Sequence, residues 1–186
     1  VIGLDVSPDM LAEVNGYKMP NEEFIEGDIR AIPYPRGRFD KVFARMVVHG
    51  LLGERDVAMA MKECYRVLVP GGKFIFSEGI PSDRKTQAWY TQMFKLKEER
   101  RTMTVSRMRT MMQRVGFKNI KATIHTIRQS SVANWLDNSD TPPEKRELIM
   151  QAYRTMPDHV TKGYNAVQTD DDVRIDIKFA IVGGEK

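Results

Sequence analysis

The chain has 186 residues, of which 41% are hydrophobic and 29% are charged, and its formal net charge is +4. This length supports one globular domain with its own core, and the apolar runs are much shorter than the ~20 residues that cross a bilayer. The single cysteine excludes a disulfide within the chain, and the three histidines show no metal-ligand spacing. We therefore expect a soluble, cytoplasmic protein with no membrane insertion and no metal site.

The first residues predict a strand that turns directly into a helix. Residues 1–5 are an apolar stretch ending in Asp5, and Ser7 followed by Pro8 is a typical helix start for residues 8–14. A carboxylate at the end of a parallel strand is placed to accept hydrogen bonds from the hydroxyls of a nucleotide ribose. A glycine-rich loop usually lies roughly 20 residues before such an acid, so the chain is expected to begin one βα unit late.

The next segments alternate between strand and helix patterns. Strands are predicted at residues 23–29, 39–44 and 73–77, and a helix is predicted at residues 55–68, where Pro70 and two glycines end it. Such alternation is typical of a parallel α/β sheet. Right-handed crossovers would bring the strand ends Asp5, Asp28, Arg45 and Glu78 to one rim, where open sheets bind ligands.

The second half of the chain predicts helices first and strands later. Residues 87–100 predict a helix that could form a lid, and a core helix begins near Thr104 and ends at Gly116. Residues 120–124 and 173–182 alternate as strands, and a helical insertion that opens with a capping box at residues 141–144 separates them. We expect a single domain with a cofactor core at 1–83, a lid and core helix at 84–116, and C-terminal strands with the insertion at 117–186.

Two further segments carry candidate functional residues. Asp28 could accept from the exocyclic amine of a purine while the Ile29 amide donates to a ring nitrogen, and Gly27 would let the base approach closely. The stretch from Ala44 to His49 would then lie beside the reacting end of the cofactor. His49 is either a general base or a packed histidine, and the sequence leaves both interpretations open.

Four segments together resemble a known family. They read Leu-Asp-Val-Ser-Pro-Asp-Met at residues 4–10, Phe-Ile-Glu-Gly-Asp-Ile at 24–29 with Ile-Pro-Tyr-Pro at 32–35, Phe-Asp-Lys-Val-Phe-Ala at 39–44, and Arg-Val-Leu-Val-Pro-Gly-Gly-Lys at 66–73. In this order they resemble successive motifs of the class I S-adenosylmethionine-dependent methyltransferases, nearest to the branch that methylates ubiquinone and menaquinone precursors. The resemblance implies a doubly wound, Rossmann-like α/β fold of seven mostly parallel strands, the last antiparallel.

The resemblance also implies roles for individual residues toward S-adenosyl-L-methionine. Asp5 would hold the ribose, Val6 and Met10 would flank the adenine, Asp28 and Ile29 would read its edge, and Arg45 would border the methionine moiety. The family's glycine-rich first motif, which wraps the amino-acid end of the cofactor, does not occur within residues 1–186.

The implied reaction is methyl transfer to a small organic acceptor. We expect the acceptor to lie under the helix at residues 87–100 and the insertion that carries Trp135, Tyr153 and Tyr164. The segment from Lys95 to Lys121 is strongly basic, which favours an anionic acceptor if the segment faces the cleft. Without interleaved aromatic residues, however, a solvated helix face is the simpler interpretation, so a nucleic-acid partner is not expected.

Three other classes of function remain as alternatives. A nicotinamide-dependent oxidoreductase would also use an acid after its second strand, although no Tyr-x-x-x-Lys pair occurs. A non-catalytic binding module could keep the fold without its cofactor loop, and a nucleic-acid methyltransferase would use the basic segment. The sequence is compatible with a homodimer and does not identify the acceptor.

Overall fold

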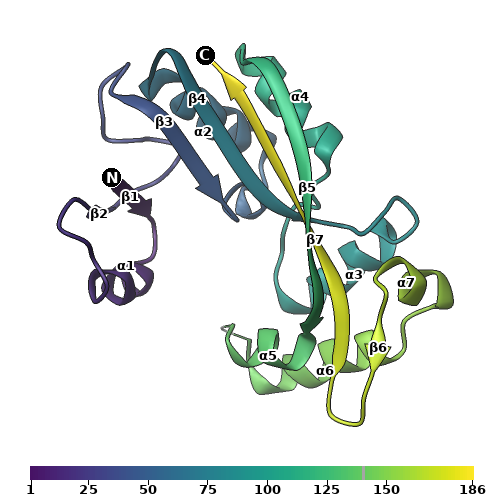
Figure 1. Ribbon diagram of the computed structural model, residues 1–186. Helices are drawn as coiled ribbons and strands as arrows, with labels where there is room; N and C mark the ends of the chain where they lie inside the picture. The colour runs from purple at the N-terminus through teal and green to yellow at the C-terminus, as the bar shows by residue number, and fades with distance from the viewer. Residues whose placement is uncertain (140) are drawn as a thin grey trace.

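The computed structural model describes residues 1–139 and 141–186 and shows a mixed α/β architecture with two sheets (Figure 1). The smaller sheet pairs β1 (Ile2–Asp5) with β2 (Glu23–Glu26) in parallel, and α1 (Pro8–Asn15) connects them. The larger sheet has five strands in the order β3-β4-β7-β5, with β6 against β7. These strands are β3 (Phe39–Arg45), β4 (Leu68–Ile80), β5 (Lys118–Ser131), β6 (Val167–Gln168) and β7 (Val173–Glu185).

The strand directions confirm the predicted fold class. β3 and β4 are parallel, and β7 runs antiparallel between β4 and β5. The seven strands nevertheless divide into two sheets rather than one. Among the described residues, β1 pairs only with β2 and β3 pairs only with β4, so each keeps one backbone edge without a strand partner. The strand ends Asp5 and Arg45 therefore belong to different sheets.

A first hydrophobic core lies between the larger sheet and two helices, α2 (Glu54–Val67) and α4 (Val105–Val115). Three methionines of α4, Met108, Met111 and Met112, are buried in this core. Cys64 is also completely buried there, and burial raises the pKa of its thiol to about 12. A thiol in this state is unreactive at neutral pH, so Cys64 is a structural residue.

A second core surrounds the first half of β7 and is built by four helices (Figure 1). These are α3 (Gln87–Lys97), α5 (Val132–Asp137), α6 (Pro143–Arg154) and α7 (Asp158–Gly163). Val173 and Ile175 of β7 pack in this second core, whereas Ala180 and Val182 pack in the first. The alternation of β7 therefore buries opposite faces at its two ends, and Ile181, which the simple alternation would turn inward, is 37% exposed.

Several predicted boundaries shift because strand pairing extends beyond the apolar pattern. β4 begins at Leu68, directly after α2, and continues through Pro70 and both glycines, since the amide of Lys186 donates to the Gly72 carbonyl. β5 extends to Ser131 because it follows β7 along most of its length. Among the described residues, no helix is both long and apolar enough to cross a membrane.

Two helix ends also differ from their predicted positions. α3 stops at Lys97, because Glu98 takes an extended conformation with φ −155° and ψ 155°. The capping box predicted at residues 141–144 is wrong, since the N-cap of α6 is Pro142, which offers no side-chain acceptor. Thr141 instead uses its carbonyl oxygen to accept from Arg146 Nε at 2.6 Å.

Candidate functional site

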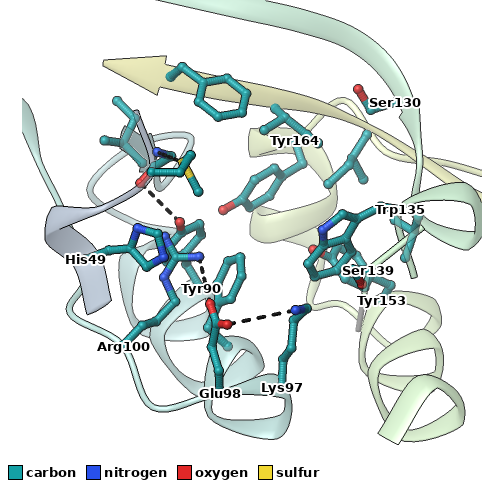
Figure 2. Close-up of a pocket in the computed structure, with 18 of the residues that line it drawn as sticks. His49, Tyr90, Lys97, Glu98, Arg100, Ser130, Trp135, Ser139, Tyr153 and Tyr164 are labelled. Atoms are coloured by element: carbon teal, nitrogen blue, oxygen red, sulfur yellow. Dashed lines mark hydrogen bonds and ion pairs between the residues drawn. The ribbon is translucent and has the colours of Figure 1, made fainter. Parts of the chain in front are cut away.

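A cavity of about 580 Å³ lies between the two cores, and six aromatic side chains contribute to its mixed apolar and polar lining. These six residues are Tyr90, Phe94, Trp135, Tyr153, Tyr164 and Phe179. They come from α3, α5, α6, β7 and the residue after α7, and Figure 2 shows the rings of Tyr90, Trp135, Tyr153 and Tyr164 around one space. The lid helix and the insertion, which were predicted to cover an acceptor, thus do border the same cavity.

His49 enters this cavity from a single 3-10 turn, η1 (Val48–Gly50), that follows β3. Between β3 and this turn, Met46 adopts a positive φ of 54°. Glu78, near the end of the neighbouring strand β4, is 1% exposed and binds the backbone of the turn. Its Oε1 accepts from the backbone amides of Val47, Val48 and His49 at 3.2, 2.7 and 3.3 Å.

The other oxygen of Glu78 orients the imidazole. Oε2 lies 2.8 Å from Nδ1 of His49, whose side chain is only 14% exposed. A carboxylate can only accept, so Nδ1 carries a proton in this pair. In the neutral form of the ring, this arrangement selects the tautomer whose lone pair is on Nε2. The sequence placed Glu78 at a strand end but gave no sign of this pairing.

The phenols of the cavity are hydrogen-bond donors rather than bases. Burial raises the pKa of Tyr90 to about 12, and its hydroxyl donates to the Gly79 carbonyl at 3.2 Å. Burial also raises the pKa values of Tyr153 and Tyr164 well above their ordinary range. All three hydroxyls stay protonated at neutral pH, so the cavity groups able to take a proton include the His49 imidazole and the Glu98 carboxylate.

Three charged side chains reach the cavity from the end of α3 and the residues after it. Arg100 is 4% exposed, and its guanidinium carbon lies 4.2 Å from the centroid of the Phe94 ring. Glu98 lies 3.3 Å from Arg100 and 3.8 Å from Lys97, as the dashed lines in Figure 2 indicate. Two cations thus share one carboxylate, so this side of the cavity has an excess of positive charge.

The predicted ribose acid lies outside the cavity, at the end of β1. Oδ1 of Asp5 accepts from the Ser7 amide at 2.9 Å, and no partner for Oδ2 is found among the described residues. Val6 and Met10 beside it are 64% and 50% exposed, although both are apolar. An open carboxylate oxygen next to bare apolar side chains fits a ribose with a flat base. Met10 also lines the cavity, so α1 connects the two regions.

Asp28, the predicted adenine reader, is already engaged. Its two oxygens accept from the amide and the guanidinium of Arg30 at 2.5–3.0 Å, and Arg30 lies 3.2 Å from Asp56. The hydrogen bonds from Arg30 hold the pKa of Asp28 below its usual range. A carboxylate has about four lone-pair sites, so one more donor can still be accepted. Gly27 serves packing as well, because a Cβ there would lie 2.5 Å from Leu4 Cδ1.

The remaining predicted cofactor residues are scattered around the first core. Ala44 packs within that core, Ile29 is partly buried against it, and Arg45 is exposed. Of all the predicted site residues, the cavity brings together His49 and Met10.

The basic segment splits into two parts. Arg101 is tied to the loop before α2, where it donates to the Leu51 and Leu52 carbonyls and to Glu54. Arg107, Arg109 and Arg114 lie on the exposed side of α4. The helical part is therefore the solvated face that its spacing favoured, whereas Lys97 at the end of α3 and Arg100 just after it bring cations to the cavity.

Comparison with known proteins identifies the first part of the chain. The sequence model of the methyltransferase domain family matches residues 1–76. A demethylmenaquinone methyltransferase from Lactococcus lactis is 36% identical over 100 residues, which cover 52% of this chain and 37% of that protein. The chain thus spans well under half the length of the curated relatives it matches.

Solved structures extend the likeness to the whole chain. The YcgJ protein of Bacillus subtilis covers 100% of this chain with a TM-score of 0.79 at 19% identity, and the chain covers 81% of it. A phosphoethanolamine N-methyltransferase from Haemonchus contortus, solved with S-adenosyl-L-methionine, covers 100% with a TM-score of 0.57 at 18% identity, and the chain covers 43% of it. Residues 1–76 thus match the methyltransferase domain family, and the chain as a whole has the fold of these solved structures.

Proposed function

We propose that the protein transfers a methyl group from S-adenosyl-L-methionine to a small organic acceptor held in the aromatic cavity. The observation that carries this proposal is the arrangement of His49, whose Nδ1 is fixed by a buried carboxylate while the ring borders a cavity of small-molecule size. The match of residues 1–76 to the methyltransferase domain family supports the same reaction. The reaction is expected to take place in the cytoplasm.

The residues at the adenosine end fit the cofactor. Asp5 would accept from the two ribose hydroxyls through its open oxygen, and the exposed side chains of Val6 and Met10 would flank the adenine. Asp28 and the Ile29 amide would read the edge of the base beside Gly27. Ala44 and Arg45 would border the methionine end.

When bound, the cofactor supplies an electrophilic methyl group, so the protein's task is to align the acceptor and exclude water. Correct orientation of two reactants can contribute roughly 7–11 kcal/mol to lowering the barrier. Aromatic walls with few polar atoms suit that task. His49 would accept a proton from the acceptor at Nε2, and Glu78 would stabilise the imidazolium that forms.

The curated relatives suggest which small molecules to test first. Those of Lactococcus lactis and Chlorobaculum tepidum are named for demethylmenaquinone, and one from Enterobacter lignolyticus is named for the malonyl group on acyl-carrier protein. A ring-bearing acceptor fits the aromatic cavity better than a nucleic acid, because the exposed basic face of α4 lies away from it. A homodimer remains a prediction.

The proposal is tested by following a radiolabelled methyl group from S-adenosyl-L-methionine. We expect label in an organic-soluble product when 1,4-naphthoquinol or 1-hydroxy-2-naphthoate is the acceptor, and no label on transfer RNA or duplex DNA. Label confined to nucleic acid would favour the nucleic-acid methyltransferase. Cofactor binding without transfer to any acceptor would favour a non-catalytic module.

A further inference from the structure

Arg100 combines almost complete burial with unsatisfied hydrogen-bond donors. Its side chain is 4% exposed, yet Nε and Nη2 find no hydrogen-bond partner within the described part of the chain. Nη1 donates to Glu98 at 3.3 Å, and the guanidinium carbon lies 4.2 Å from the centroid of the Phe94 ring. Buried guanidinium groups are normally fully paired, because an unpaired buried donor on a charged group is costly. The two free nitrogens therefore indicate a partner that is not part of the protein.

The free nitrogens form one edge of the guanidinium, and this chain shows what that edge binds. Arg66 holds Glu63 through the same pair, with Nε and Nη2 each 2.7 Å from one carboxylate oxygen. Arg30 holds Asp28 through the same pair, with Nε 3.0 Å from Oδ1 and Nη2 2.5 Å from Oδ2. In both cases two parallel N–H bonds match the two oxygens of a planar carboxylate. Arg100 presents this edge without a carboxylate.

The surroundings of Arg100 define the rest of the ligand. Tyr164 contributes a second buried donor that has no partner among the described residues, and Figure 2 shows its hydroxyl and the Arg100 guanidinium turned toward the same space. Lys97 adds positive charge to the cavity lining. Most of the other lining side chains are apolar, and Trp135 and Phe179 supply aromatic rings. An anionic group must therefore lie on an otherwise flat and apolar molecule.

We propose that Arg100 and Tyr164 bind the carboxylate of a ring-bearing acid, and that this acid is the class of acceptor the protein methylates. The part that concerns the acceptor rests on the proposed function, whereas the binding of the acid does not. Arg100 is thus a specificity-determining residue. Its Nε–Nη2 edge receives the carboxylate, the Tyr164 hydroxyl donates to one of the same oxygens, and the ring packs against the aromatic walls.

The binding claim is tested by calorimetric titration of the protein with 2-naphthoate, its neutral analogue 2-naphthamide, and 2-naphthol. We expect 2-naphthoate to bind roughly tenfold or more tightly than the other two, because only the acid can take two charge-assisted hydrogen bonds. Equal affinity for acid and amide, or no binding of the acid, would overturn the proposal. Tighter binding of the naphthol would do so too, by pointing to a ring oxygen instead.

Three variants separate binding from a structural role. R100K keeps the charge but loses the paired edge, and we expect it to weaken 2-naphthoate roughly tenfold while leaving 2-naphthamide unchanged. R109K, which changes an exposed arginine of α4, is the matched control and should change neither affinity. R100M should melt at the same temperature as the parent or higher, because it removes an incompletely paired buried charge; a lower melting temperature in R100M would mark Arg100 as structural and count against the proposal.

Titration with S-adenosylhomocysteine in the same samples keeps the two proposals apart. Loss of the acid preference with intact binding of S-adenosylhomocysteine would overturn this inference alone. Preserved acid preference without S-adenosylhomocysteine binding would overturn the proposed function and leave the binding site in place.

Discussion

Replacing His49 with alanine is expected to reduce the rate of methyl transfer by about 10²–10⁴-fold, the range for loss of a positioned general base. Cofactor affinity should change little, because His49 borders the acceptor cavity and not the end of β1. The measurement is a comparison of kcat with the dissociation constant of S-adenosylhomocysteine. H159A, which removes an exposed histidine of α7, is the control. Unchanged turnover in H49A would reduce His49 to a packed side chain.

Replacing Glu78 with glutamine tests the same proton acceptor from its buried side. The glutamine oxygen can still accept from the amides of η1, so the fold should persist. Its NH₂ group would then meet Nδ1 of His49, which must become the acceptor and leave the proton on Nε2. We expect turnover to fall nearly as far as in H49A, with an altered pH profile. A turnover equal to that of the parent would show that Glu78 only supports the turn.

The second large effect is expected at Asp5. Changing Asp5 to asparagine keeps an oxygen for the Ser7 amide but removes the charge that would hold the ribose. Hydrogen bonds to a charged group contribute about 1.5–3 kcal/mol each, so we expect the affinity for S-adenosylhomocysteine to fall about 10–100-fold. D9N alters an exposed acid in the first turn of α1 and serves as the control. An affinity in D5N that equals that of D9N would remove Asp5 from the cofactor site.

The parts of the fold that the sequence predicted are those set by local periodicity. The apolar stripes of α2 and α4 each form one buried side, the Ser7 cap is formed as expected, and the helix expected near Thr104 begins there. The course of β7 could not be predicted in the same way. Its alternation is regular, but the chain packs two cores against opposite faces of the strand, and only the tertiary structure decides where burial changes sides.

The candidate site likewise contains residues that the sequence could indicate and residues that only the tertiary structure reveals. His49 and the aromatic residues of the insertion could be proposed from their types and positions. Glu78 and Arg100 could not, because their significance depends on burial. A glutamate at a strand end becomes an anchor only when the amides of η1 converge on it, and Arg100 looks like one cation in a basic segment until its neighbours are known. Thr141 is the opposite case. Residues 141–144 have the sequence pattern of a capping box, but the structure has Pro142 at the N-cap of α6.

The central claim is that this chain binds S-adenosyl-L-methionine through the end of β1 and α1. Calorimetric titration of the protein at its natural length with S-adenosylhomocysteine, and separately with NADH, tests it most directly. The account predicts saturable binding of S-adenosylhomocysteine at one site, weakened in D5N, and no heat from NADH. Binding of NADH with no binding of S-adenosylhomocysteine would contradict the account and favour a nicotinamide-dependent enzyme.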